Sequence, residues 1–260
     1  MTLRHLLVTL LLLTSISPAF AQTALQPVPK VMVYKIAWNG IKIGRIIVEA
    51  AQTNYSYRMS LDTKTTGMVN MFAPLKSVIW ASGRVYEGRL IPQKYNSRAA
   101  SDEGDKDSTH ELTYDEDGLL VDRVSFPPND PSWRPDVPLE EARDAYDPVT
   151  GFFILREKMF VNVNRRIKDT HVTTYDGRRL AEFTFKAVNN GTKMRNGKIV
   201  PVINTVMFRK PINGYTPKEL KKFDEGDPKI HVYFSADRRF IPLEFDIYHW
   251  SGKITASLDE

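Results

Sequence analysis

The chain has 260 residues, of which 36 are basic and 31 acidic, with no cysteine and a formal net charge of +5. Disulfides and thiol chemistry are therefore excluded, and the small positive excess is mostly dispersed in pairs such as Arg165-Arg166 and Lys221-Lys222. Aromatic and basic residues do not interleave as they do in grooves that stack bases, so we expect no nucleic-acid partner.

The first residues, MTLRHLLVTLLLLTSISPAFA, have the three parts of an export signal. Arg4 supplies the positive charge, residues 6–16 form an apolar run, and Ala19-Phe20-Ala21 is a small-x-small cleavage motif. The apolar run is shorter than the roughly 20 residues that a membrane-spanning helix needs. We therefore expect residues 1–21 to be a cleaved signal peptide rather than a buried helix. Residues 22–260 are expected to form a single β-rich domain in the periplasm, with no transmembrane segment.

The first element expected after the leader is a β-hairpin over residues 34–50. Tyr34, Ile36 and Trp38 occupy alternate positions before Asn39-Gly40, and the alternation resumes after that pair. Asn-Gly between two alternating segments predicts a type I′ turn, because both central residues of this turn need positive φ.

Strand patterns continue along the chain at hairpin spacing, with turn signals such as Asp176-Gly177 and Asn196-Gly197 between them. The further expected strands are residues 55–62, 76–82, 89–97, 108–114, 119–125, 171–175, 179–188, 192–195, 198–209, 229–235, 239–250 and 253–258.

Helix signals are few. Asp147-Pro148 predicts an N-cap followed by a proline at the first helical position, and this helix is expected to end near Phe160. Thr216-Pro217 repeats the signature over a shorter segment, whereas residues 125–138 hold five prolines and predict an extended loop. The predicted fold class is therefore all-β, mainly antiparallel with roughly a dozen strands, forming an open or spiral β-barrel with one main helix.

The sequence contains no recognisable catalytic or metal-binding constellation. No two histidines of the mature chain stand three to five residues apart, so no zinc-ligand spacing exists, and no G-x-S-x-G motif is present. We accordingly expect no catalytic residues, no metal site and no cofactor. Carboxylates are abundant, and a pair suited to acid/base chemistry would have to be assembled by the fold.

The apolar face of the sheet is the remaining candidate for function. A sheet of about a dozen strands encloses more volume than one helix fills, so part of its inside is a candidate cavity for acyl chains or apolar peptide segments. A completely filled core, plugged by residues 68–72, is the competing interpretation. The candidate ligand-binding residues are Tyr34, Ile36, Trp38, Tyr57, Met68, Met71 and Phe72.

Several motifs resemble those of an exported proteobacterial family that is defined as a domain of unknown function. The motifs are the W-N-G-x-x-x-G hairpin at residues 38–44, Thr66-Gly67, Asp147-Pro148 and Tyr175-Asp176-Gly177-Arg178-Arg179. The resemblance implies an envelope protein without established catalytic residues. The pattern is also similar in fold to periplasmic β-spiral envelope-integrity proteins and lipoprotein-carrier half-barrels, and some of these relatives look disulfide-bearing, which this chain is not.

Together these features favour a non-enzymatic periplasmic protein that binds an apolar ligand or a partner segment and supports cell-envelope integrity. The expected partners are a lipid or apolar peptide and an envelope protein. The alternative is a hydrolase of envelope polymers whose carboxylates meet only in the fold. Facing carboxylates across a polar cleft would favour the hydrolase, and an apolar concavity would favour the binding protein.

Overall fold

The computed structural model describes residues 27–66, 76–100, 107–164, 169–224, 230–249 and 252–259. The expected signal peptide and three candidate ligand-binding residues, Met68, Met71 and Phe72, lie outside these described residues.

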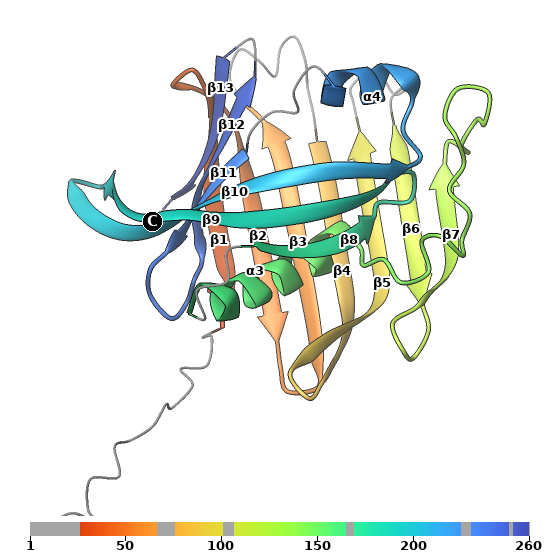
Figure 1. The fold of residues 1–260 in the computed structure, drawn as a ribbon, viewed down its shortest axis with the longest axis horizontal. Coiled ribbons are helices and arrows are strands. Elements are labelled where there is room, and N and C mark those ends of the chain that lie inside the picture. Colours follow the sequence, from red (N-terminus) through yellow and green to blue (C-terminus); the bar gives the residue numbers. More distant parts are fainter. Residues whose placement is uncertain are drawn as a thin grey trace, which may run out of the picture.

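The described residues form one antiparallel sheet of 13 strands together with two helices, α3 (Pro148–Asn164) and α4 (Pro217–Asp224) (Figure 1). The strands are β1 (Val31–Trp38), β2 (Ile41–Gln52), β3 (Ser56–Thr65), β4 (Lys76–Tyr86), β5 (Arg89–Ala100), β6 (Ser108–Tyr114), β7 (Leu120–Phe126), β8 (Asp169–Tyr175), β9 (Leu180–Arg195), β10 (Lys198–Asn213), β11 (Ile230–Ser235), β12 (Pro242–His249) and β13 (Gly252–Asp259).

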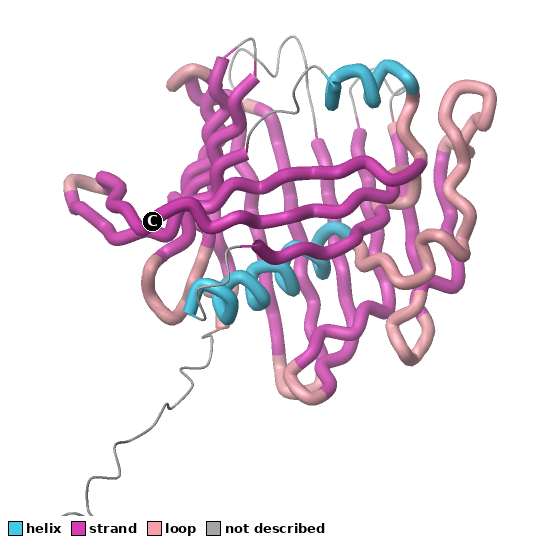
Figure 2. Tube along the Cα trace, in the orientation of Figure 1, coloured by secondary structure: helices cyan, strands magenta, loops and turns pink. Residues whose placement is uncertain are grey.

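The sheet consists of two meanders joined through β1 and β13. Its order is β7-β6-β5-β4-β3-β2-β1-β13-β12-β11-β10-β9-β8, so β7 and β8 are its two edges. The sheet curves around α3 without closing, which confirms the predicted all-β, open-barrel fold with one main helix (Figure 2). No described helix combines the length and the apolar composition needed to cross a bilayer.

Turn chemistry fixes the hairpins where the sequence predicts them. Asn39 and Gly40 have φ values of 46° and 85°, as a type I′ turn between β1 and β2 requires. Asn196 and Gly197 repeat this geometry between β9 and β10, with φ values of 45° and 74°. Gly177, between β8 and β9, has a φ of 96°. These positive φ values confirm the glycine positions of the predicted hairpin turns.

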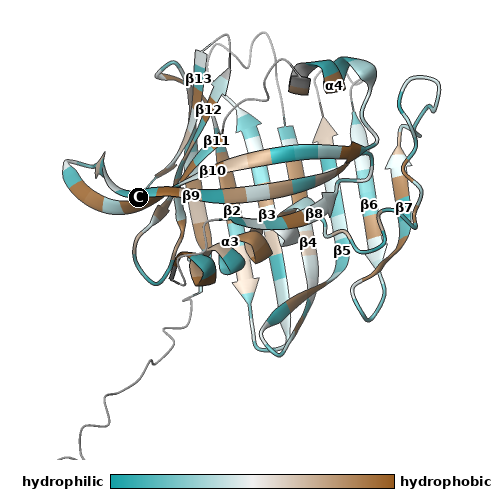
Figure 3. Cartoon of the chain, viewed as in Figure 1, coloured by the Kyte–Doolittle hydropathy of each residue, from teal (hydrophilic) through white to brown (hydrophobic). Residues whose placement is uncertain are grey.

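Helix α3 begins at the predicted cap and lies inside the curve of the sheet (Figure 1). The Oδ1 atom of Asp147 accepts hydrogen bonds from the backbone N–H groups of Val149 at 3.0 Å and Thr150 at 2.8 Å. The helix ends at Asn164, four residues beyond the predicted end at Phe160. Apolar and polar residues alternate along many strands around it (Figure 3).

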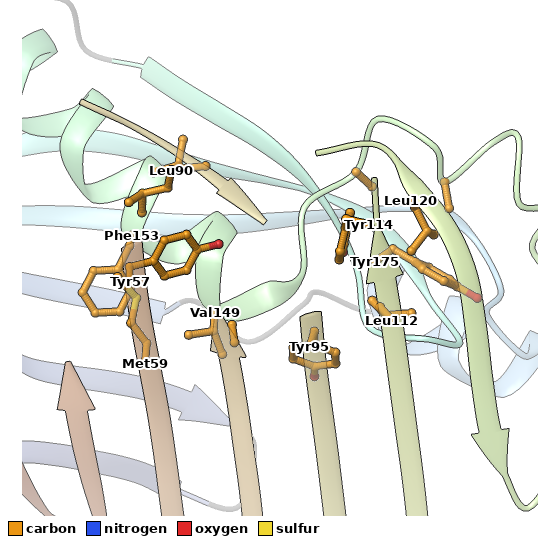
Figure 4. Close-up of a cluster of buried hydrophobic side chains, with 14 of the residues drawn as sticks. Tyr57, Met59, Leu90, Tyr95, Leu112, Tyr114, Leu120, Val149, Phe153 and Tyr175 are labelled. Atoms are coloured by element: carbon orange, nitrogen blue, oxygen red, sulfur yellow. The ribbon is translucent and has the colours of Figure 1, made fainter. Parts of the chain in front are cut away.

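Buried apolar side chains from both meanders surround α3. Tyr57, Met59, Tyr95 and Leu112 from β3, β5 and β6 lie on the same side of the sheet as α3 (Figure 4). Further along α3, Leu155 and Met159 belong to a second buried cluster, formed with Val172, Phe185, Val232, Phe234 and Phe240. The helix therefore buries side chains on more than one of its faces, and it fills the part of the concavity that it crosses.

Several predicted boundaries are wrong, and for two of them the pairing and turn geometry give the reason. Residues 180–188 and 192–195 belong to one continuous strand, β9, because the long ladder with β10 extends through Asn189-Asn190-Gly191. A register shift absorbs Val188 as an extra residue between the paired Ala187 and Asn189. The strand expected from residue 239 begins at Pro242, since residues 236–241 form a tight turn that the Ser235 N–H closes by donating to the Ile241 carbonyl at 2.8 Å.

Candidate ligand-binding concave face

Cross-strand pairing puts three of the sequence-predicted residues on the concave face of the sheet. Tyr34 lies opposite Leu258, Ile36 opposite Ala256, and Trp38 opposite Ile254, so the three side chains share one face of β1. Tyr34 belongs to a buried apolar cluster inside the sheet, which identifies this face as the concave one.

Exposure increases along this face of β1 toward the β1–β2 turn. Tyr34 is 3% exposed and donates a hydrogen bond from its hydroxyl to the Pro242 carbonyl at 2.7 Å. Ile36 is half-buried, and Trp38 is 42% exposed. The same face of one strand is therefore closed at one end and open at the other.

Neighbouring strands repeat this change. On β3, Tyr57 and Met59 are buried, whereas Leu61 is half-buried. On β4, Ala81 is buried, whereas Ile79, which pairs with Leu61, is half-buried. Leu61 and Ile79 still pack against the buried cluster that includes Phe153 of α3. We call the buried part of the concave face its filled half and the less buried part its open half.

Apolar side chains dominate the open half where β1, β12 and β13 meet. Ile247 of β12 pairs with Ile254 of β13, and both are half-buried. We define the open half of the concave face by the inward-facing residues Ile36, Trp38, Ile247 and Ile254. A surface of this kind suits an apolar chain, because binding becomes more favourable in proportion to the apolar area that the ligand removes from water.

Two of the predicted ligand-binding residues lie in the filled half. Tyr34 packs on Phe245 in an edge-to-face arrangement with ring centroids 5.9 Å apart. The Tyr57 hydroxyl lies 2.9 Å from Oγ1 of Thr150 in the first turn of α3. Of the seven predicted residues, Ile36 and Trp38 are therefore those that reach the open half among the described residues.

The filled half holds a buried carboxylate at the start of α3. Asp147 is fully buried, and burial raises its pKa to about 6 in spite of the hydrogen bonds from Thr150 and Val149. Its Oδ2 atom and the buried Tyr114 hydroxyl have no hydrogen-bond partner within the part of the chain that the structure describes. Burial also raises the pKa of the Tyr114 hydroxyl, and the carboxylate of Asp147 adds to the rise.

A second buried carboxylate, Asp246, lies on the convex face. It accepts a hydrogen bond from Thr255 at 2.8 Å and pairs with Lys253 at 3.3 Å. Because Asp147 is inside the sheet and Asp246 outside it, these two side chains do not form the facing pair that acid/base hydrolysis uses. Among the described residues, no group of three or more His, Asp or Glu side chains could hold a metal ion.

Sequence reasoning missed part of the open half. Ile247 is on a face that alternation marks as inward, whereas Ile254 carries no such mark beyond ordinary strand pattern. Their proximity to Ile36 and Trp38 depends on the pairing of β1 with β13, which joins the two ends of the described chain. Neither turn signals nor alternation contain that information.

The fold has relatives of known structure. A β-barrel-like protein of the domain-of-unknown-function family DUF1849 from Brucella abortus has a similar fold, with a TM-score of 0.50 and 12% sequence identity, covering 90% of this chain and 97% of that one. A protein from Bacteroides fragilis with a YmcC-like fold has a TM-score of 0.37 and 10% identity over the same fractions.

No curated protein matches this sequence. The family model described as a protein of unknown function, DUF3108, matches residues 33–259, which span every strand of the sheet except the first two residues of β1. Both the match and the barrel-like fold agree with the resemblance found in the sequence. The chain therefore belongs to the DUF3108 family.

Proposed function

We propose that this protein is a non-enzymatic periplasmic protein that binds an apolar segment in the open half of its concave face. The preferred ligand is a lipid acyl chain, and binding it supports the cell envelope. The periplasmic location rests on the export signal expected at residues 1–21.

The observation that carries the proposal is the exposure of apolar side chains on a face that is buried at its other end. Ile36, Ile247 and Ile254 come from three adjacent strands, β1, β12 and β13, and all are half-buried on the inward side. Covering the exposed part of such apolar side chains with an apolar ligand removes them from water, which favours binding. Trp38 stands beside Ile254 at the rim and would report on an occupant.

The test is to add palmitate or a lysophospholipid to the purified protein and to follow tryptophan emission and thermal unfolding. A ligand that binds only the folded state raises the free energy of unfolding by about 2.7 kcal/mol at a hundredfold excess over Kd. Trp38 emission should shift to shorter wavelength, and Trp133→Phe, which removes an exposed ring in the proline-rich loop, should keep this shift. Apolar peptides form a parallel arm of the same measurement.

Two isoleucines provide a matched pair of variants. Ile36 faces inward opposite Ala256, and Ile47 faces outward opposite Val33, although both are half-buried. Ile36→Ser should reduce the stabilisation that the ligand adds to that variant's own unliganded melt, and Ile47→Ser should leave this stabilisation unchanged. Equal effects of the two variants, or no emission change and no stabilisation with any lipid or peptide, would contradict the proposal.

A further inference from the structure

The β9–β10 hairpin concentrates the positive charge of the chain. Its residues, 180–213, contain six basic residues and one acidic residue, Glu182. The whole chain has 36 basic and 31 acidic residues, so the rest of it carries 30 basic against 30 acidic. The net positive charge of the protein therefore belongs to this hairpin.

Apolar side chains are exposed at the end of the same hairpin. Met194 and Ile199 are directly opposite each other across the two strands, on one face, and are 67% and 68% exposed. They flank the Asn196-Gly197 turn, which lies at the left end of the hairpin where it projects beyond the body of the molecule (Figure 1). Lys198, also at the turn, is exposed and has no carboxylate partner among the described residues.

The other face of the hairpin end is attached to the convex side of the sheet. Lys193 pairs with Glu244 and lies 3.6 Å from Asp246. Arg195 donates hydrogen bonds to the carbonyls of Leu243 at 2.9 Å and Leu258 at 2.5 Å. These contacts hold the hairpin end in place on β12 and β13, so Met194 and Ile199 are presented to solvent from a fixed position.

We propose that the end of the β9–β10 hairpin docks on the surface of an anionic lipid bilayer. Met194 and Ile199 enter the headgroup region, and Lys198 lies at the level of the lipid phosphates. This hairpin carries the net positive charge of the chain, with the exposed Lys198 at its end, and is therefore attracted to the negative surface potential of such a bilayer. Two adjacent apolar side chains are too small for a stable protein interface, which buries on the order of 1,000 Å² or more, whereas they suffice as a shallow anchor beside basic residues.

The test is co-sedimentation of the purified protein with vesicles of phosphatidylethanolamine and phosphatidylglycerol, and with vesicles of phosphatidylcholine alone. We expect binding to the anionic vesicles that weakens as salt is raised, and at least tenfold weaker binding to the neutral ones. Met194→Ser with Ile199→Ser should lower the partition coefficient about tenfold, and Lys198→Glu should lower it in the anionic vesicles alone. Because these positions are exposed, thermal melts should match wild type.

The matched control is Val124→Ser with Phe126→Ser, which removes two exposed apolar side chains from the edge strand β7 and should leave vesicle binding unchanged. Equal loss in this control and in the hairpin variant would overturn the proposal, as would equal binding to neutral vesicles or no binding at all. Soluble polyglutamate tests for simple attraction between opposite charges. If wild type and the Met194/Ile199 variant both bound polyglutamate as strongly as they bind vesicles, the hairpin would act only as a polycation, and the proposal would be overturned.

Discussion

Arg123 on β7 donates a hydrogen bond to the hydroxyl of Tyr175 at the end of β8, and these two residues link the two edges of the sheet. The Tyr175 hydroxyl in turn donates to the Gly177 carbonyl at 2.9 Å, and Arg123 also donates to the Val137 carbonyl at 2.7 Å. The edges are thus joined by side chains and by the loop that follows β7, without a backbone ladder between β7 and β8.

Tyr175→Phe should destabilise the protein by about 1–3 kcal/mol, because it removes one acceptor from Arg123 and the closer of two donors to the Gly177 carbonyl, which keeps only the Ser125 hydroxyl at 3.4 Å. Urea unfolding followed by circular dichroism measures this difference. Tyr55→Phe is the control, since Tyr55 is highly exposed in the turn before β3. Equal midpoints for Tyr175→Phe and wild type would show that this contact contributes nothing to holding the edges together.

Asp147→Asn should gain stability relative to wild type as pH rises. Burial raises the pKa of Asp147 to about 6, above its unfolded value of 3.8, so the folded state binds the proton more tightly. The contribution of Asp147 to stability is complete below pH 3.8 and is lost as pH rises through 6. Since one pKa unit corresponds to about 1.4 kcal/mol, the neutral asparagine should gain up to about 3 kcal/mol between pH 4 and pH 7.

The comparison must be made between variant and wild type at each pH, because His110 acts in the opposite direction. Burial and then Arg178 lower the pKa of His110 to about 4, so its contribution to stability is lost as pH falls from 6.5 to 4. This contribution is common to both proteins and cancels in the difference. A difference in the free energy of unfolding that stays constant from pH 4 to pH 7 would contradict the assignment to Asp147.

Glu219→Gln should destabilise the protein by about 2–3 kcal/mol. Glu219 accepts hydrogen bonds from the backbone N–H of Thr216 at 2.8 Å and from Arg179, and it pairs with the buried Arg134 at 2.9 Å. Loss of its charge leaves the Arg134 guanidinium buried without a counter-charge. Glu140→Gln serves as the control, because Glu140 is exposed. Thermal unfolding of both variants decides the outcome, and equal midpoints would show that Arg134 does not need this partner.

Gly40→Val should cost about 1–2 kcal/mol through backbone conformation alone, because Gly40 has a φ of +85° and open space around its added Cβ. Gly83→Ala should cost more for a different reason, since a Cβ there would lie 2.1 Å from the Ile91 carbonyl oxygen and 2.7 Å from the Tyr57 ring. Thermal melts of the two variants test this order. If Gly83→Ala unfolded at the same temperature as wild type, β4 and β5 would have to move apart around the new Cβ without any loss of stability, and the prediction would be wrong.

Local signals predicted the elements well, because turns and caps depend on a few adjacent residues. Asn39-Gly40 fixed the first hairpin and Asp147-Pro148 fixed the start of α3, both through backbone conformations that few other residues adopt. Asn189-Asn190-Gly191 shows the limit of such signals. It reads as a break between strands, yet pairing with β10 keeps it extended.

The open half of the concave face could not be predicted from the sequence, because it depends on contacts between strands and on the orientation of α3. Helix α3 is apolar around much of its circumference, with Phe153 and Ile154 in one buried cluster and Leu155 and Met159 in the other. A helix without a polar side carries no sequence signal for its orientation. Alternation could place Tyr34 and Trp38 on one face, but Tyr34 is buried by contacts with Phe245 and Pro242, which lie more than 200 positions away in the sequence.

The pairing of β1 with β13 also determines the order in which the protein can fold. Lys253 donates a hydrogen bond to the Asn39 side chain from 214 positions away, and strands from the two ends of the described chain are neighbours in the middle of the sheet. Each newly emerging chain therefore carries a bare β1 edge until β13 has followed it. Contacts this distant in sequence slow folding, and an unpaired central strand is open to pairing with other chains. Shielding of that edge until β13 has paired with it would thus limit aggregation more than any stabilisation of the finished sheet.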